Sequence, residues 1–152
     1  SGVAGMKGMA VIQVEKGMVS DGAGFSAILL DMLKRREIPF EQILTGIDTV
    51  SIVIRTEVLN SVRKSLMEEI NLILKPDRLT VTENLSMIAV VGEAKGTVGG
   101  ATVKVLKAVT DAGIEISTIN QGAGKLNLII GVAEDRYTDA IKAIYATIDQ
   151  KN

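Results

Sequence analysis

The sequence contains no histidine and no cysteine, and these two absences exclude much of ordinary enzyme chemistry. Without histidine the commonest general base is missing, so Ser-His and Cys-His nucleophile pairs are excluded. Without cysteine there are no disulfides and no thiolate ligands for a metal ion, and no cluster of aspartates replaces them. We therefore predict no catalytic residues, no metal site and no cofactor.

Aromatic residues and excess charge are also scarce. The chain has two Phe, two Tyr and no Trp, which is too few for the base-stacking surfaces of RNA-binding domains. Its formal net charge is −1, which gives no electrostatic reason to expect a nucleic-acid or anionic-membrane partner. No apolar run approaches the roughly 18 residues that a bilayer-spanning helix needs. We therefore expect neither nucleic acid nor a membrane as a partner.

A nucleotide-binding loop is missing as well. The stretch Gly96-Thr97-Val98-Gly99-Gly100 resembles a phosphate loop only loosely, because no Gly-Lys-Ser or Gly-Lys-Thr follows it. A Walker site is thus excluded, and we predict that the chain by itself has no phosphotransferase activity.

The most informative feature that is present is a repeat, in which the pattern around Ile12 recurs around Ile88. Without a gap, this one offset matches apolar residues, which form cores, and glycines, which form turns. The chain has 152 residues, 47% of them hydrophobic, so each half is long enough for a small domain with its own core. We predict two domains of one fold. Matched pairs include Gly24 with Gly100, Ile43 with Ile119, Ile52 with Leu128 and Ile54 with Ile130.

Each half has the pattern of a strand, a helix, two strands and a second helix. Apolar runs predict the strands, and apolar residues at helical spacing predict the helices. Pro39 ends the first helix, and Thr56 is expected to cap the second. The predicted strands are 9–14, 40–44, 49–55, 78–83, 87–91, 116–121 and 125–132. The predicted helices run from Gly22 to before Pro39, from Thr56 to before Lys75, and over 100–112 and 136–149.

The two halves differ at their ends. The first half closes with a fourth strand at 78–83, which gives the order of a ferredoxin-like fold, whereas the second half stops after its second helix. The missing strand leaves a sheet edge unpaired, and the segment from Gly2 to Met6 is the remaining candidate to fill it. We therefore predict an α+β protein of two ferredoxin-like domains with antiparallel sheets. The first domain, 8–83, is inserted into the second, which comprises 84–152 and the N-terminal strand 1–7.

The strand-to-helix loops, Gly17–Ser26 and Glu93–Ala101, are the best candidates for binding sites. Their glycines let backbone N–H groups approach a ligand, and the helix dipole favours an anion such as a carboxylate. Ser20 adds a hydroxyl, and Glu41 begins a strand that we expect beside the first strand, so that its side chain can face the loop and hold an ammonium group. Together the two poles fit a zwitterionic amino acid. The alternative is that the glycines only form tight turns and that Glu41 is solvated.

Several segments resemble the regulatory region of aspartate kinases, a pair of ACT domains that sense small molecules in amino-acid metabolism. The resemblance covers essentially the whole chain, although Asn120 stands where that family often has Ser. In the second half the matching segments are Val90-Val91-Gly92-Glu93, Ala112-Gly113-Ile114 and Ile119-Asn120-Gln121-Gly122-Ala123. In the first half they are Gly24-Phe25, Ile38-Pro39-Phe40-Glu41 and Gly46-Ile47-Asp48.

The resemblance implies the allosteric part of a monofunctional, cytoplasmic aspartate kinase, with an N-terminal kinase domain as its partner in the full-length protein. It also implies a homodimer with ACT sheets side by side and an end-product amino acid at that interface, lysine first and threonine next. Lysine-sensitive members have Asp where Glu41 stands. Two alternatives stay open: a free-standing amino-acid-binding ACT regulator, and a ligand-free dimerisation module.

The resemblance also implies a set of effector contacts when the positions of the family are carried over. Lysine has two cations, so Asp21 is included as a second carboxylate that could bind one of them. The loop before Gly100 is the alternative, second site. The first set is Met18, Val19, Ser20, Asp21, Gly24, Phe25, Ser26, Phe40 and Glu41, and the second is Gly99, Gly100, Asn120 and Gln121.

Overall fold

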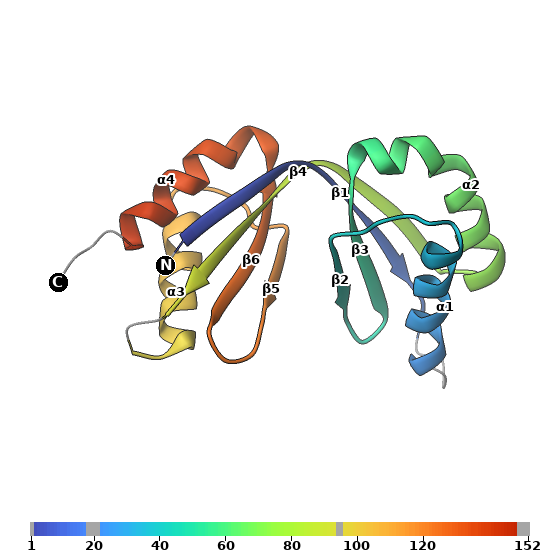
Figure 1. Ribbon diagram of the computed structural model, residues 1–152, viewed down its shortest axis with the longest axis horizontal. Coiled ribbons are helices and arrows are strands. Elements are labelled where there is room, and N and C mark those ends of the chain that lie inside the picture. The colour runs from blue at the N-terminus through green and yellow to red at the C-terminus, as the bar shows by residue number, and fades with distance from the viewer. Residues whose placement is uncertain (1, 18–21, 94–95, 149–152) are drawn as a thin grey trace. The chain divides into compact units, whose positions relative to one another are not determined.

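The computed structural model describes residues 2–17, 22–93 and 96–148, and the chain divides into two compact units (Figure 1). The first unit, Gly8–Glu83, is called the inserted unit below. The second, called the host unit, consists of Asn84–Asn152 together with Ser1–Lys7. Two long strands, β1 (Gly2–Glu15) and β4 (Arg78–Gly92), contribute to both units.

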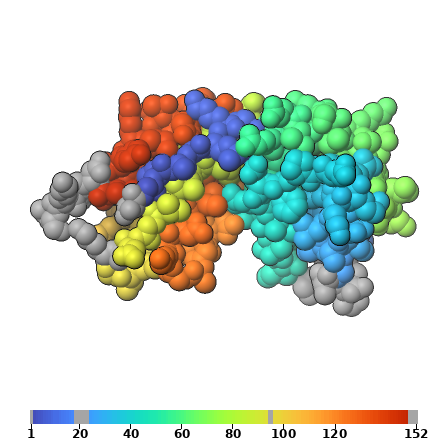
Figure 2. All heavy atoms as spheres, viewed as in Figure 1, coloured from blue at the N-terminus to red at the C-terminus, as the bar shows by residue number. Residues whose placement is uncertain are grey.

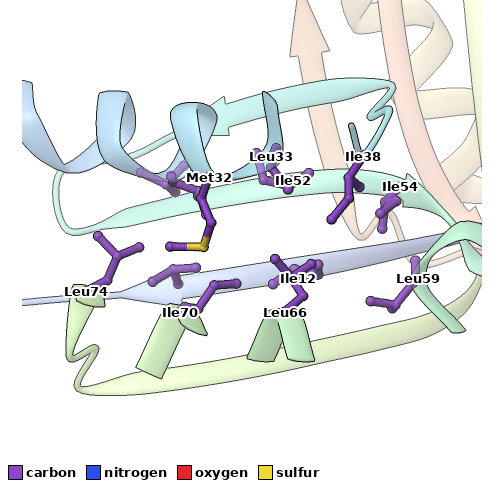
Figure 3. Packing of buried hydrophobic residues seen from close by; sticks show 14 residues of the cluster. Ile12, Met32, Leu33, Ile38, Ile52, Ile54, Leu59, Leu66, Ile70 and Leu74 are labelled. Atoms are coloured by element: carbon purple, nitrogen blue, oxygen red, sulfur yellow. The ribbon is translucent and has the colours of Figure 1, made fainter. Parts of the chain in front are cut away.

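The inserted unit is a sheet with two helices on one face (Figure 1). Its strand order is β2-β3-β1-β4, and both β1 and β2 pair antiparallel with β3. The apolar positions at helical spacing on α1 and α2 face the sheet and form one buried core with alternate strand residues (Figure 3). The elements proper to this unit are α1 (Gly22–Arg35), β2 (Gln42–Thr45), β3 (Thr49–Arg55) and α2 (Thr56–Leu74).

The host unit repeats this architecture, with the strand order β1-β4-β6-β5. Its N-terminal segment is part of the unit: a Cβ added to Gly5 would lie 2.0 Å from the Tyr137 hydroxyl. In Figure 2 the N-terminal residues accordingly lie against atoms of the C-terminal half of the chain. The remaining elements are α3 (Val98–Asp111), β5 (Thr118–Gln121), β6 (Leu126–Ala133), a 3-10 turn (Glu134–Arg136) and α4 (Tyr137–Ile148).

The predicted fold class is confirmed, including the insertion of one ferredoxin-like domain into the other. The predicted strand boundaries at the unit border are wrong, because 2–6 and 9–14 are one strand, as are 78–83 and 87–91. Near the border the backbone turns through left-handed residues, Gly8 (φ 70°) and Asn84 (φ 57°), within continuous strands. Polar residues at the border do not end β1 or β4, because a strand is continued by backbone hydrogen bonds to its neighbours and does not require apolar side chains.

The offset between the two repeats also changes within the chain. Ile12 pairs with Ile52, whereas Ile88, the counterpart of Ile12, pairs with Ile130. The repeat offset seen between Ile12 and Ile88 therefore holds through the second strand of each unit. From the third strand onwards, matched residues lie two positions further apart in the sequence. The gap-free match of Ile52 with Leu128 is thus wrong by two residues, a shift that keeps every side chain on its own face of the sheet.

Two helix starts differ from the predictions. Thr56 is the first residue of α2 rather than its cap, and its Oγ1 is buried without a hydrogen-bond partner among the described residues. Helix α3 starts two residues earlier than predicted, at Val98, because Thr97 is the residue that caps it. The Thr97 Oγ1 accepts a hydrogen bond from the Gly100 N–H at 3.0 Å.

Candidate functional site

The first turn of α1 presents backbone N–H groups at the end of the predicted loop. Gly24, Phe25 and Ser26 lie in or near this turn and are half-buried, and Phe25 packs against the core of the inserted unit. The first N–H groups of a helix lack partners within the helix, so such a turn suits a carboxylate. The other predicted loop residues, Met18, Val19, Ser20 and Asp21, lie outside the described residues.

The base of this loop is held by contacts that were not predicted from the sequence. The Gly17 N–H donates to Asp77 Oδ2 at 2.5 Å, and the Lys16 ammonium donates to the carbonyl of Leu74 at 2.7 Å. The Lys16 N–H donates to the carbonyl of Asp48 at 2.8 Å. The loop therefore starts from a fixed point between the end of α2 and the β2–β3 hairpin. From the sequence, Lys75-Pro76-Asp77 indicates only the end of a helix.

Glu41 lies at the opposite end of the sheet from this loop. Because β1 and β2 both pair antiparallel with β3, they run parallel. The first residue of β2, Gln42, is level with Val11, so Glu41 is level with Ala10 rather than Glu15. At about 3.3 Å per residue, Glu41 and the loop of the same chain are roughly 16 Å apart along the strands. The prediction that Glu41 faces its own loop is therefore wrong. The reason is that β2 runs parallel to β1, with β3 between them, so the start of β2 is remote from the end of β1.

Glu41 forms an ion pair with Arg55, the last residue of β3. The Arg55 Nε lies 3.2 Å from Glu41 Oε1, and the two side chains are 45% and 34% exposed. The Glu41 N–H donates to the carbonyl of Val53 at 2.8 Å, which fixes the backbone beside this pair. Phe40, also predicted as a contact, is adjacent and 39% exposed. Residues 14 apart on two strands give no local sequence signal for such a pair.

In the host unit the predicted second set is brought together. Gly99 and Gly100 are in the first turn of α3, and Asn120 and Gln121 end β5 at the same end of the sheet. The Gln121 Oε1 lies 3.0 Å from the Thr102 hydroxyl on α3. Thr102 was not predicted. Its signal in the sequence is the repeat, since Thr102 is the counterpart of Ser26, and Gln121 is the counterpart of Thr45 at the same offset.

The titratable group whose pKa is clearly shifted lies away from both loops. The pKa of Arg35 is raised by its hydrogen bond to the Asp31 carboxylate, and this pair lies towards the end of α1 that is remote from the loop. Within residues 2–17, 22–93 and 96–148, no three His, Cys, Asp or Glu side chains gather as a metal site would need. No helix in these ranges has the length and apolar character needed to cross a membrane.

Comparison with known proteins gives one consistent answer. Residues 88–148 match the family model of the ACT domain. Aspartokinase 3 of Bacillus subtilis is 30% identical over 145 residues, which are 95% of this chain and 32% of that protein. The crystal structure of Clostridium acetobutylicum aspartate kinase superimposes with a TM-score of 0.87 at 30% identity, over 95% of this chain and 34% of that one.

The part of these proteins that matches has the fold of a regulatory domain. A putative C-terminal regulatory domain of aspartate kinase from Porphyromonas gingivalis has the same fold, with a TM-score of 0.73 at 20% identity. Here the match covers 95% of this chain and 94% of that one, whereas the chain spans only about a third of aspartokinase 3. In sequence, the chain is thus similar to about a third of an aspartate kinase, and in fold to a putative regulatory domain of one, while residues 88–148 match the ACT domain.

Proposed function

We propose that this chain senses an end-product amino acid and thereby inhibits the phosphorylation of aspartate by a kinase domain of the same protein. The observation that carries the proposal is the match to the regulatory region of aspartate kinases over 95% of the chain. The inserted unit has the same ferredoxin-like strand order as the host unit, so we infer that it is a second ACT domain.

Lysine is the first candidate for the effector and threonine the second. A solved relative, Escherichia coli aspartokinase III in complex with lysine and aspartate, has a TM-score of 0.77 at 21% identity over 99% of this chain. This likeness supports the fold, and the choice of lysine rests on the lysine bound in that relative. The proposed contacts are the loop at 18–21, the first turn of α1 at Gly24–Ser26, and Phe40 with Glu41.

The proposed site requires two copies of the chain. The loop end and Glu41 are roughly 16 Å apart within one inserted unit, at about 3.3 Å per residue, which is too far for one amino acid to bridge. Strand β2 is at the edge of the strand order, and an edge strand can pair with a second copy. If two β2 strands pair antiparallel about a two-fold axis, the start of one is level with the end of the other.

This pairing brings Glu41 of one subunit to the loop end of its partner. The end of β2 leads into the hairpin whose Asp48 carbonyl accepts from the Lys16 N–H, so the hairpin and the loop are already neighbours. The effector carboxylate then binds the start of α1 in one subunit, and its cation binds Glu41 in the other. We therefore propose a homodimer with two equivalent composite sites.

A thermal-shift screen of the twenty amino acids, followed by calorimetry of each ligand that stabilises the chain, tests the proposed function. A ligand present at 100 times its dissociation constant stabilises the folded state by about 2.7 kcal/mol, which is a readily measured shift in Tm. We expect such a shift for lysine or threonine. If no amino acid gives a heat of binding or a shift in Tm, the chain is a dimerisation module without a ligand.

A further inference from the structure

The carboxylate of Glu41 already has a cationic partner in the absence of any ligand. The Arg55 Nε is 3.2 Å from Glu41 Oε1, and both side chains reach solvent. Arg55 is held by its backbone, because it is paired with Met9 of β1 and occupies the N-cap position of α2. Its side chain makes no capping hydrogen bond to α2.

This ion pair changes what the negative end of the site offers to a ligand. Glu41 alone attracts an ammonium group, whereas the pair of Glu41 and Arg55 has no net charge. A ligand cation that approaches Glu41 must displace the Arg55 guanidinium or lie beside it, and two like charges at such a distance repel each other. Where the side-chain end of the ligand is what approaches this pair, an ammonium group there meets the obstacle, whereas an uncharged side chain of the same length does not.

We propose that Arg55 is a specificity-determining residue that occupies Glu41 and lowers the affinity of the site for amino acids with a cationic side chain, relative to uncharged isosteres. This inference rests on the proposed function, since it needs Glu41 to belong to an effector site. Arg55 acts through Glu41 and does not itself have to touch the ligand.

The test compares lysine with norleucine, which has the same carbon chain without the side-chain ammonium. Calorimetry of the whole chain and of Arg55→Gln gives the ratio of the two dissociation constants in each protein. We expect Arg55→Gln to shift this ratio in favour of lysine by about three- to tenfold, because the competing interaction is a solvent-exposed one. That range corresponds to about 0.7–1.4 kcal/mol at 25 °C.

The matched control is Arg63→Gln. Arg63 on α2 pairs with Glu83 at 2.6 Å, with side-chain exposures of 44% and 36%, so the control removes the same charge from an equally exposed pair in the same unit. An equal shift in this variant overturns the inference, because it indicates a general charge effect. Arg55→Lys keeps the cation, and we expect it to retain a ratio close to that of the parent chain. Adding Glu41→Gln to Arg55→Gln should abolish the gain for lysine.

The outcomes separate the inference from the proposed function. If no amino acid binds the parent chain or any variant, the proposed function fails. If an amino acid binds but the ratio is unchanged in Arg55→Gln, or lysine binds neither protein, the inference about Arg55 is overturned and the sensing function stands. A shift confined to Arg55→Gln and lost with Glu41→Gln supports the inference.

Discussion

At the scale of single residues, Glu41 is the most direct test of the proposed site. We expect Glu41→Ala to weaken effector binding at least tenfold, because truncating a charged partner in a partly desolvated site typically costs about 2–5 kcal/mol. The fold should not change, since an exposed ion pair such as Glu41–Arg55 contributes about 0–1 kcal/mol to stability. Calorimetry gives the affinity and thermal unfolding the stability. Unchanged affinity would move the site to the host unit, to Gly99, Gly100, Asn120 and Gln121.

Ser86 is a residue whose polar group is costly to the folded state. It is fully buried in β4, and its hydroxyl has no hydrogen-bond partner among the described residues. We expect Ser86→Ala to stabilise the protein by about 1 kcal/mol, since it removes a buried group that is not hydrogen-bonded. Urea unfolding measures the change in the free energy of unfolding.

The control for Ser86 is a buried hydroxyl that does have partners. Thr102 is 7% exposed and lies 3.0 Å from both the Val98 carbonyl and Gln121 Oε1. Thr102→Val keeps the shape but removes the hydroxyl, so we expect a loss of about 1 kcal/mol. A loss of stability in both variants would contradict the idea that the Ser86 hydroxyl is unpaired in the folded protein.

At the scale of elements, β1 carries the main structural prediction because its first half closes the host sheet. A Cβ on Gly5 would lie 2.0–2.5 Å from three atoms of the Tyr137 ring and hydroxyl, so the ring rests directly on the strand backbone. We expect Gly5→Ala to destabilise the protein by about 1–3 kcal/mol, as over-packing does. Gly2→Ala in the same strand is the control, since its Cβ would lie 4.0 Å from Val91, an ordinary contact. Equal thermal shifts for the two variants would mean that Tyr137 moves aside freely.

The elements also show what the sequence can and cannot predict. Apolar periodicity predicts the four α-helices of the described residues and the succession of strands and helices along the chain, because each amphipathic face needs a core. It does not predict that β1 and β4 are continuous, because the partners that continue them are backbone groups from distant segments. The two extra residues in the host unit between β5 and β6 are hidden for a similar reason: a shift of two preserves the alternation of the strand.

The candidate site illustrates the same limit. The glycine loops and Glu41 can be found from local residue types, but their separation depends on how the strands pair and in which direction they run. Because β2 runs parallel to β1, its first residues lie level with the start of β1, which puts Glu41 at the end of the sheet away from the loop. The pairs Glu41–Arg55 and Gly17–Asp77 likewise join residues 14 and 60 positions apart, and no local sequence pattern indicates that such residues are in contact.

At the scale of the whole molecule, the separation between the loop and Glu41 links effector binding to dimerisation. If each site is formed by two subunits, a monomer has only half of each site, and the effector binds the dimer alone. By mass action each bound effector then stabilises the dimer, and two sites act together. At a free effector concentration ten times its dissociation constant, the apparent dimer dissociation constant should fall by about a hundredfold.

Sedimentation velocity over a range of chain concentrations, with and without lysine or threonine, measures this link. We expect dimers at micromolar concentration and a shift to lower dissociation constants with the effector, because β2 has an edge that a second copy covers. The Glu41→Ala variant is the control: it should still dimerise without effector, since Glu41 pairs with Arg55 of its own chain, but should lose most of the effector's influence. An effector that binds tightly to a chain that stays monomeric would show that one subunit holds the entire site. In that case the site belongs at the start of α3 with Gln121, where the groups of a single chain already meet.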